Sequence, residues 1–153
     1  AKLSDSGSEV AITFDADTPW SFDGSPAAGE YDFESVAAHE LLHIFGFGVG
    51  EPAFVRHVAG WDGASGVYVG PAVRALMGGP VPVTGDFGVP DHWGPEVSYN
   101  GQASPVREAI PAGTRRPVTE LDLAALKDVG WEVATAAPPP TPTRTPVPTP
   151  APA

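Results

Sequence analysis

Two histidines spaced four residues apart, with a glutamate between them, are the residues of this chain best suited to chemistry. His39, Glu40 and His43 form the motif His-Glu-x-x-His, inside a largely apolar run at 36–47 that is typical of a helix. Residues four apart lie on one face of a helix, so both imidazoles point to the same side. At that spacing two neutral histidine nitrogens reach one Zn²⁺ with bonds of about 2.0–2.1 Å. Glu40 is rotated by about 100° from the pair, which predicts a general base acting on a metal-held water rather than a ligand.

A catalytic zinc site needs a third protein ligand besides these two histidines. The chain has four histidines and no cysteine, so His57 and His92 are the remaining imidazole candidates. We favour His92, because it lies in a Gly/Pro-rich segment, predicted as a loop, that can fold back over the helix. His57 lies in a strand-like run, 54–58, close behind the helix. An acidic third ligand, such as Glu108 or Glu120, is a further alternative.

Local signals define the helix that carries the motif. Asp32 is a favourable N-cap and Gly46 a favourable terminating residue, so we expect the helix between them. One strand is predicted before it, at 10–14, and a loop at 15–30 follows that strand. The residues expected to face the core have helical spacing: Ala38, Leu41, Leu42 and Phe45.

The remainder of the chain predicts short elements and one further helix. The short elements are strands at 66–69 and 81–84 and a helix at 72–76. The last helix begins at a capping box, 119–122, and ends at Gly130. Its apolar face is formed by Leu123, Leu126 and Val129. Trp131 is expected to pack back on this helix.

Composition excludes several classes of function. The chain has 153 residues, with 8 basic against 19 acidic side chains and a net charge of −11. Nucleic-acid binding is disfavoured, since phosphate contacts need clustered Lys and Arg. The absence of cysteine excludes disulfides and thiol chemistry. No apolar run approaches the roughly 18 residues of a membrane span.

The C-terminal segment 136–153 differs in composition from the rest. Eight of its 18 residues are proline, and most of the others are Thr and Ala. Proline fixes φ and removes backbone donors, so we expect an extended linker or disordered tail outside a domain at 1–135. Such linkers join modules of extracellular proteins, which predicts a secreted or surface-attached protein with a further module or anchor beyond the tail.

Three stretches resemble the metzincin zinc proteases, and among them the leishmanolysin-like proteases and their bacterial secreted relatives. They are 31–40 around the motif, Asp-His-Trp-Gly at 91–94, and 121–131. The resemblance covers most of 10–133. It implies that His92, which follows a long insertion, completes the ligand set of His39 and His43. It also implies Glu40 as the general base.

This resemblance implies an α+β fold, with a small mixed sheet packed on the active-site helix and the C-terminal helix below the cleft. The family usually has several strands before that helix, so we expect the domain 1–135 to be N-terminally incomplete. Two positions depart from the family pattern. Val49 stands where shorter metzincin motifs carry the third ligand. The family's Met beneath the zinc is missing: Met77 precedes His92, and Ile110 is the nearest apolar stand-in.

These features predict a secreted zinc metalloendopeptidase that acts on proteins or peptides. The two departures support an alternative, a degenerate metzincin that serves as a zinc-containing binding or adhesion module without peptidase activity. A third reading is another His-Glu-x-x-His hydrolase with an acidic third ligand.

Two further groups of residues are candidates for the site. Tyr99 could donate a hydrogen bond to a developing oxyanion. The carboxylates of Asp15, Asp17 and Asp23 could bind a structural Ca²⁺, although they lack the spacing of a calcium loop.

Overall fold

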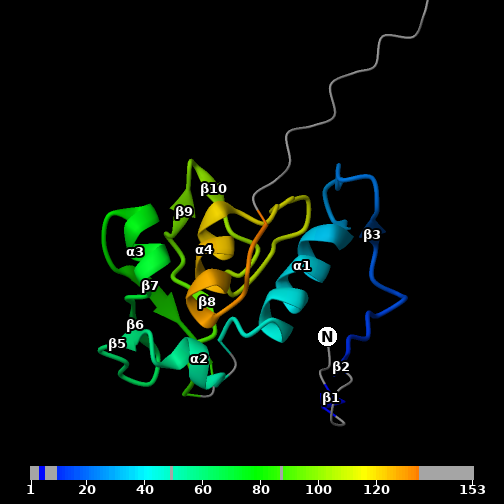
Figure 1. The fold of residues 1–153 in the computed structure, drawn as a ribbon. Helices are drawn as coiled ribbons and strands as arrows, with labels where there is room; N and C mark the ends of the chain where they lie inside the picture. The colour runs from blue at the N-terminus through cyan, green and yellow to red at the C-terminus, as the bar shows by residue number, and fades with distance from the viewer. Residues whose placement is uncertain (1–3, 6–9, 49, 87, 135–153) are drawn as a thin grey trace, which may run out of the picture.

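The described part of the chain has an α+β architecture in which four helices pack with short strands (Figure 1). The computed structural model describes residues 4–5, 10–48, 50–86 and 88–134. The helices are α1 (Phe33–Ile44), α2 (Pro52–Val55), α3 (Pro71–Met77) and α4 (Glu120–Val129). None of the helices in these ranges is long and apolar enough to cross a membrane. The Pro/Thr-rich segment 136–153 lies outside the described residues.

A four-stranded sheet forms one side of the molecule. Its strands are β5 (Val58–Ala59), β6 (Ser65–Tyr68), β7 (Val81–Thr84) and β8 (His92–Trp93), in that spatial order. All three of its ladders are antiparallel. In the described ranges, parallel pairing is found at a bridge between Trp93 and Arg107 and between two N-terminal strands. The strands predicted at 66–69 and 81–84 and the helix at 72–76 are therefore confirmed within one residue.

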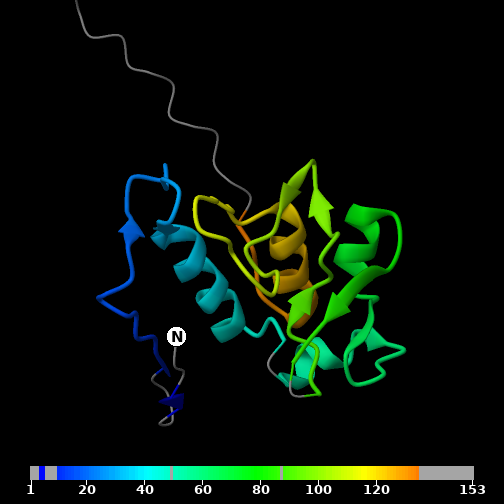
Figure 2. The ribbon, with the colours of Figure 1, turned by 180° about the vertical axis from the view of Figure 1, so that it is seen from behind.

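The N-terminal region forms separate two-stranded pairs. Antiparallel β1 (Ser4–Asp5) and β2 (Val10–Ala11) form one pair, and parallel β3 (Trp20–Ser21) and β4 (Tyr31–Asp32) form the other. The strand predicted at 10–14 is thus too long, and the loop predicted at 15–30 contains β3. Residues 12–14 have no ladder partner among the described residues, and Phe14 packs its ring on Phe33 instead, with centroids 4.8 Å apart. Figure 2 shows this region along the outer side of α1.

Helix α4 lies centrally and supplies much of the core (Figures 1 and 2). The predicted capping box is present, since Thr119 N and Oγ1 each donate to Asp122 Oδ2 at 2.8 Å. Gly130 ends the helix with φ +113°, as predicted. Trp131 does not pack back on α4. Its ring packs on Phe45, with centroids 5.4 Å apart, and its Nε1 donates to the Phe45 carbonyl at 2.7 Å.

The burial of α1 differs from the predicted pattern. Leu42 is buried, whereas Leu41 and Phe45 are 41% and 40% exposed. The apolar residues of this helix surround its axis, so their spacing alone did not identify the inward face. The inward face is shared by Leu42 and the two motif histidines.

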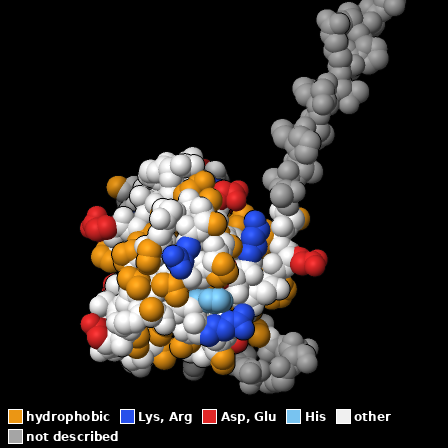
Figure 3. Space-filling model, turned by 60° about the vertical axis from the view of Figure 1, so that its left-hand side comes forward, with side chains coloured by type: hydrophobic (Ala, Val, Ile, Leu, Met, Phe, Trp, Pro, Cys, Tyr) orange, Lys and Arg blue, Asp and Glu red, His pale blue; other side chains and the backbone are white. Residues whose placement is uncertain are grey.

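The run at 54–58 is not one strand, because it contains the end of α2, a turn at 56–57 and the first residue of β5. Glu51 caps α2, whose first residue is Pro52, a favourable first helical position. His57 follows α2 and contacts the carbonyl oxygen of Asp128 at 3.1 Å through Nε2. Arg56 donates to the same carbonyl. Figure 3 shows the face on the α3 side, where a histidine lies among Lys and Arg side chains.

Candidate metal centre

The start of α1 is held by a buried carboxylate, as the predicted N-cap requires. Asp32 Oδ1 accepts from Ser35 N at 2.8 Å and from Ser35 Oγ at 2.5 Å. Arg115 Nη1 donates to Asp32 Oδ2 at 3.0 Å. Burial alone would raise the pKa of Asp32, but the Ser35 hydrogen bonds and the Arg115 charge outweigh it and lower that pKa. The ionised cap therefore fixes the helix that carries the motif.

The end of α1 brings the chain against the segment before β8. Gly46 has φ +98° and ends the helix, as predicted. Gly48 has φ +74°, and a Cβ there would overlap the Cα of Asp91. The two backbones therefore touch at a point where only glycine fits. This contact places His92, the next residue, beside the motif helix.

His92 lies on a strand, not in the predicted loop. It pairs with Thr84 of β7, so β8 is the edge strand of the four-stranded ladder. Its neighbour Trp93 is fully buried, and Trp93 Nε1 donates to Asp122 Oδ1 of α4 at 2.9 Å. Side chains alternate along a strand, so anchoring Trp93 in the core turns His92 to the opposite face. This strand was not predicted from the sequence, because it is two residues long and such a short strand shows no alternating pattern.

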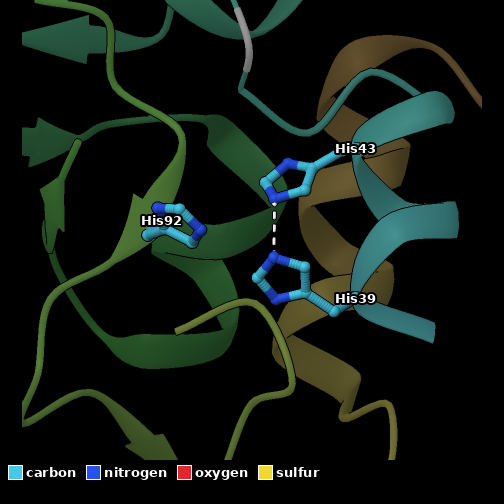
Figure 4. A group of neighbouring side chains, drawn as sticks. All are labelled: His39, His43 and His92. Atoms are coloured by element: carbon cyan, nitrogen blue, oxygen red, sulfur yellow. Dashed lines mark hydrogen bonds between the residues drawn. The ribbon is translucent and has the colours of Figure 1, made fainter. Parts of the chain in front are cut away.

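Three imidazoles meet between α1 and β8 (Figure 4). His39, His43 and His92 each offer one nitrogen, and these atoms lie within 4.8 Å of one another. The Nε2 atoms of His39 and His43 are 3.1 Å apart. A tetrahedral metal with bonds of about 2.0–2.1 Å holds its ligands roughly 3.3 Å apart. The group therefore has the dimensions of a three-histidine metal site.

The outer nitrogens of the two motif histidines donate to backbone carbonyls. His39 Nδ1 donates to the Pro105 carbonyl at 2.9 Å, and His43 Nδ1 donates to the Phe47 carbonyl at 2.8 Å. A carbonyl oxygen only accepts, so the proton sits on each Nδ1 and leaves a lone pair on Nε2. The two Nε2 lone pairs therefore face each other with no proton between them. A cation between them would remove that repulsion.

The outer nitrogen of the third histidine, His92, contacts a carboxylate instead of a backbone carbonyl. Asp91 Oδ1 lies 2.7 Å from His92 Nδ1, and both side chains are largely buried. Neither atom has a well-aligned hydrogen-bond partner in the described residues, so the close approach of the two side chains is the polar contact that each makes there. A carboxylate at the outer nitrogen of a metal-binding histidine orients the ring and raises its basicity. Asp91 directly precedes His92, so their contact could have been predicted from the sequence. The hydrogen bonds to the Pro105 and Phe47 carbonyls could not, because no residue type marks a backbone carbonyl as a partner.

Burial keeps the motif histidines neutral. Desolvation lowers the pKa of His43 to about 4, assisted by the nearby histidines and partly offset by the hydrogen bond to Phe47. Desolvation is also the main cause that lowers the pKa of His39. A metal ligand must be unprotonated. Both imidazoles are therefore in their ligating form at neutral pH.

A cavity of about 370 Å³ opens beside His39 and Glu40. Glu40 forms no ion pair among the described residues. Trp20, Tyr31, Val36 and Ile110 supply apolar wall, and Glu108 and Thr18 complete the lining. A peptide bound in this cavity would lie against both a candidate ligand and the candidate base.

The other candidate ligands are not part of this group. His57 binds the Asp128 carbonyl on the face described above. Glu108 lines the cavity without joining the histidines, and Glu120 is exposed at the start of α4. Val49 lies outside the described residues. Met77 ends α3 and packs against the core.

The candidate oxyanion donor and the candidate calcium ligands are not part of the three-histidine group. Tyr99 lies on β9 (Ser98–Tyr99), which pairs with β10 (Gln102–Ala103), and its side chain packs against the core. Asp15 Oδ1 accepts from Asp17 N, and Asp23 Oδ1 accepts from Ser21 and Ser25. Among the residues that the structure describes, these aspartates form no metal-binding cluster.

The geometry thus defines one centre where three imidazoles could hold a metal ion next to the carboxylate of Glu40. In each ring the outer nitrogen contacts a fixed oxygen. Such outer contacts are typical of metal-binding histidines. No protein-family model matches the chain, and neither the curated proteins nor the solved structures give a match.

Proposed function

We propose that the protein is a secreted zinc-dependent metalloendopeptidase. The observation that carries the proposal is the convergence of His39, His43 and His92, with Glu40 on the adjoining cavity wall. Three protein ligands that leave one coordination position open are typical of catalytic zinc, whereas structural zinc has four protein ligands. The described residues provide three imidazoles and no cysteine, which favours zinc over metals that prefer carboxylate ligands.

The metal, when bound, would act as a Lewis acid toward water and the scissile carbonyl. Glu40 takes a proton from the attacking water and delivers it to the leaving amine. The Pro105 and Phe47 carbonyls keep the protons of the motif histidines on Nδ1, and the Asp91 carboxylate lies 2.7 Å from His92 Nδ1, where it would favour the same tautomer. These contacts hold three lone pairs at fixed positions before any metal binds.

The metzincin resemblance agrees with this proposal. The helix carrying the motif ends at Gly46, and a distant segment supplies the third histidine. Ile110, the apolar residue expected near the site, lines the same cavity as Glu40. These agreements support a leishmanolysin-like arrangement, and the Pro/Thr-rich segment 136–153 supports an extracellular location.

A second candidate is a zinc-containing binding module without peptidase activity. The observation that favours it is the presence of Ile110 where the family has methionine. This module would bind zinc through the same three histidines and would not turn over peptides.

The test is to measure zinc content and cleavage of a varied peptide library for wild type and Glu40→Ala. Since Glu40 is no ligand, the variant should keep its zinc and lose turnover by at least about 10²–10⁴-fold. Glu96→Gln, an exposed change outside the cavity, is the control for loss of a surface charge. Cleavage by Glu40→Ala at the wild-type rate would exclude the mechanism. Zinc binding without cleavage in the wild type would favour the binding module.

A further inference from the structure

A second cavity, of about 300 Å³, carries two arginines near the metal centre. Arg107 and Arg116 lie on its wall with Thr84, Glu108 and Trp93. Both arginine side chains are half-buried. With the Glu108 carboxylate in the same lining, this cavity has a net positive formal charge in a chain whose net charge is −11.

This cavity adjoins the candidate site on two sides. Thr84 is the ladder partner of His92, so their side chains project from the same face of the sheet about 5 Å apart. Glu108 lines both this cavity and the one beside Glu40. A bound peptide that occupies the first cavity can therefore extend past Glu108 to reach Arg107.

The charges of the two arginines are not compensated within the described residues. Neither guanidinium lies within 4.0 Å of a carboxylate oxygen, whereas the neighbouring Arg115 pairs with Asp32 and Glu34. Burial and the charge of Arg107 lower the pKa of Arg116. A half-buried cation without a counter-ion is unfavourable, and a second cation nearby makes it more so. An anion in the cavity would remove both penalties.

The available donors suit a carboxylate. Arg116 Nη1 donates to the Ala109 carbonyl at 2.6 Å, which leaves its other guanidinium nitrogens for a ligand. The Thr84 hydroxyl is a further donor on the wall, whereas the Trp93 Nε1 is already bound to Asp122. Guanidinium groups bind carboxylates through paired, charge-assisted hydrogen bonds.

We propose that Arg107 and Arg116 form a subsite for a carboxylate of the peptide substrate. The carboxylate belongs to an acidic side chain or to the C-terminus of the peptide. This inference rests on the proposed peptidase function, because it places the carboxylate on a peptide lying across the metal centre. It makes the protein selective for acidic or C-terminal segments.

The test is a binding measurement that needs no turnover. Zinc-loaded Glu40→Gln protein is titrated with N-acetylated six-residue peptides of Ala, Leu and Phe that carry Glu or Gln at each position in turn. Each peptide is prepared with a free and with an amidated C-terminus. Arg107→Gln and Arg116→Gln should each weaken binding of the preferred carboxylate peptide about 10-fold or more. Arg107→Lys and Arg116→Lys, which keep the charge but lose the paired donors, should recover only part of it.

Arg74→Gln is the matched control. Arg74 is exposed on α3, so this substitution removes the same charge at a position away from the cavity. Preference for Glu over Gln identifies a side-chain carboxylate, and preference for the free acid over the amide identifies the C-terminus. Equal binding of all peptides, or equal losses for Arg74→Gln and Arg107→Gln, would overturn the subsite. Arginine-dependent binding without any wild-type cleavage would support the subsite and contradict the peptidase function. Wild-type cleavage with no preference for peptides that carry a carboxylate would support the peptidase function and contradict the subsite.

Discussion

The two longest helices of this protein are stabilised in different ways. Helix α4 buries six of its ten residues, whereas α1 buries two of its twelve. The buried residues of α4 contact α3, α2 and the back of β8 through the core. Helix α1 is held mainly at its ends, by Asp32 with Arg115 at the start and by Gly48 with Asp91 at the exit.

The two helices therefore have different roles: α4 mainly stabilises the fold, and α1 mainly carries residues of the candidate metal centre. Helix α4 contributes burial and anchors Trp93, which fixes the strand that carries His92. The side chains of α1 that face inward are mainly those of the metal centre. Changes in α4 should therefore affect mainly the free energy of unfolding, and changes at the ends of α1 should affect metal binding as well.

The largest stability effect is expected from a leucine truncation in α4. Leu121 is fully buried, so Leu121→Ala should lower the free energy of unfolding by about 2–5 kcal/mol. The same truncation at Leu41 in α1, which is 41% exposed, should cost less than about 1 kcal/mol. Urea denaturation of both variants checks the comparison. Equal losses would show that α1 is as deeply integrated in the core as α4.

A substitution at the backbone contact that follows α1 should lower the free energy of unfolding by nearly as much. Gly48 and Gly50 have φ values of +74° and +73°, so alanine at either site costs about 1–2 kcal/mol through backbone strain. Only at Gly48 would the new Cβ overlap Asp91. Gly48→Ala should therefore lose more stability than Gly50→Ala and should also weaken zinc binding. Matching zinc affinities for the two variants would contradict the role of this contact.

A smaller effect is expected at the carboxylate behind His92. Asp91→Asn removes the charge at His92 Nδ1 and should weaken zinc binding about 10–100-fold. Isothermal titration with zinc measures the change, and the exposed Asp86→Asn is the control for charge alone. An unchanged affinity for Asp91→Asn would mean that the 2.7 Å contact does not support the ligand.

The smallest effect concerns pH. In the metal-free protein the pKa of His43 is lowered to about 4, chiefly by burial, from an unfolded value near 6.5. Between these values the unfolded chain binds more protons, so stability should fall as the pH drops from 6.5 toward 4, by about 1–2 kcal/mol at pH 5. Unfolding curves at pH 7 and pH 5 measure this loss, and His43→Gln should reduce it. A loss of the same size in that variant would assign the pH dependence to other groups.

Sequence reasoning succeeded where structure is set by neighbouring residues. The N-cap Asp32, the terminating Gly46 and the capping box at Thr119 all act within one turn of their helix. Each was therefore predictable from local spacing. The pair of motif histidines was predictable for the same reason.

It failed where distant segments decide the outcome. The strand placement of His92 depends on pairing with Thr84 and on the burial of Trp93. Phe45 packs on Trp131, which is 86 residues away in the sequence, instead of facing the core. Contacts between separate segments leave no periodic pattern in the sequence, so neither was predicted.

The most direct test of the account is the zinc affinity of wild type, His92→Ala and His57→Ala measured side by side. The account predicts one zinc per chain for wild type and for His57→Ala, because His57 contacts Asp128 away from the site. His92→Ala should bind zinc far more weakly, since only the two motif histidines remain. Wild-type affinity in His92→Ala, or no zinc in the wild type, would contradict the three-histidine centre.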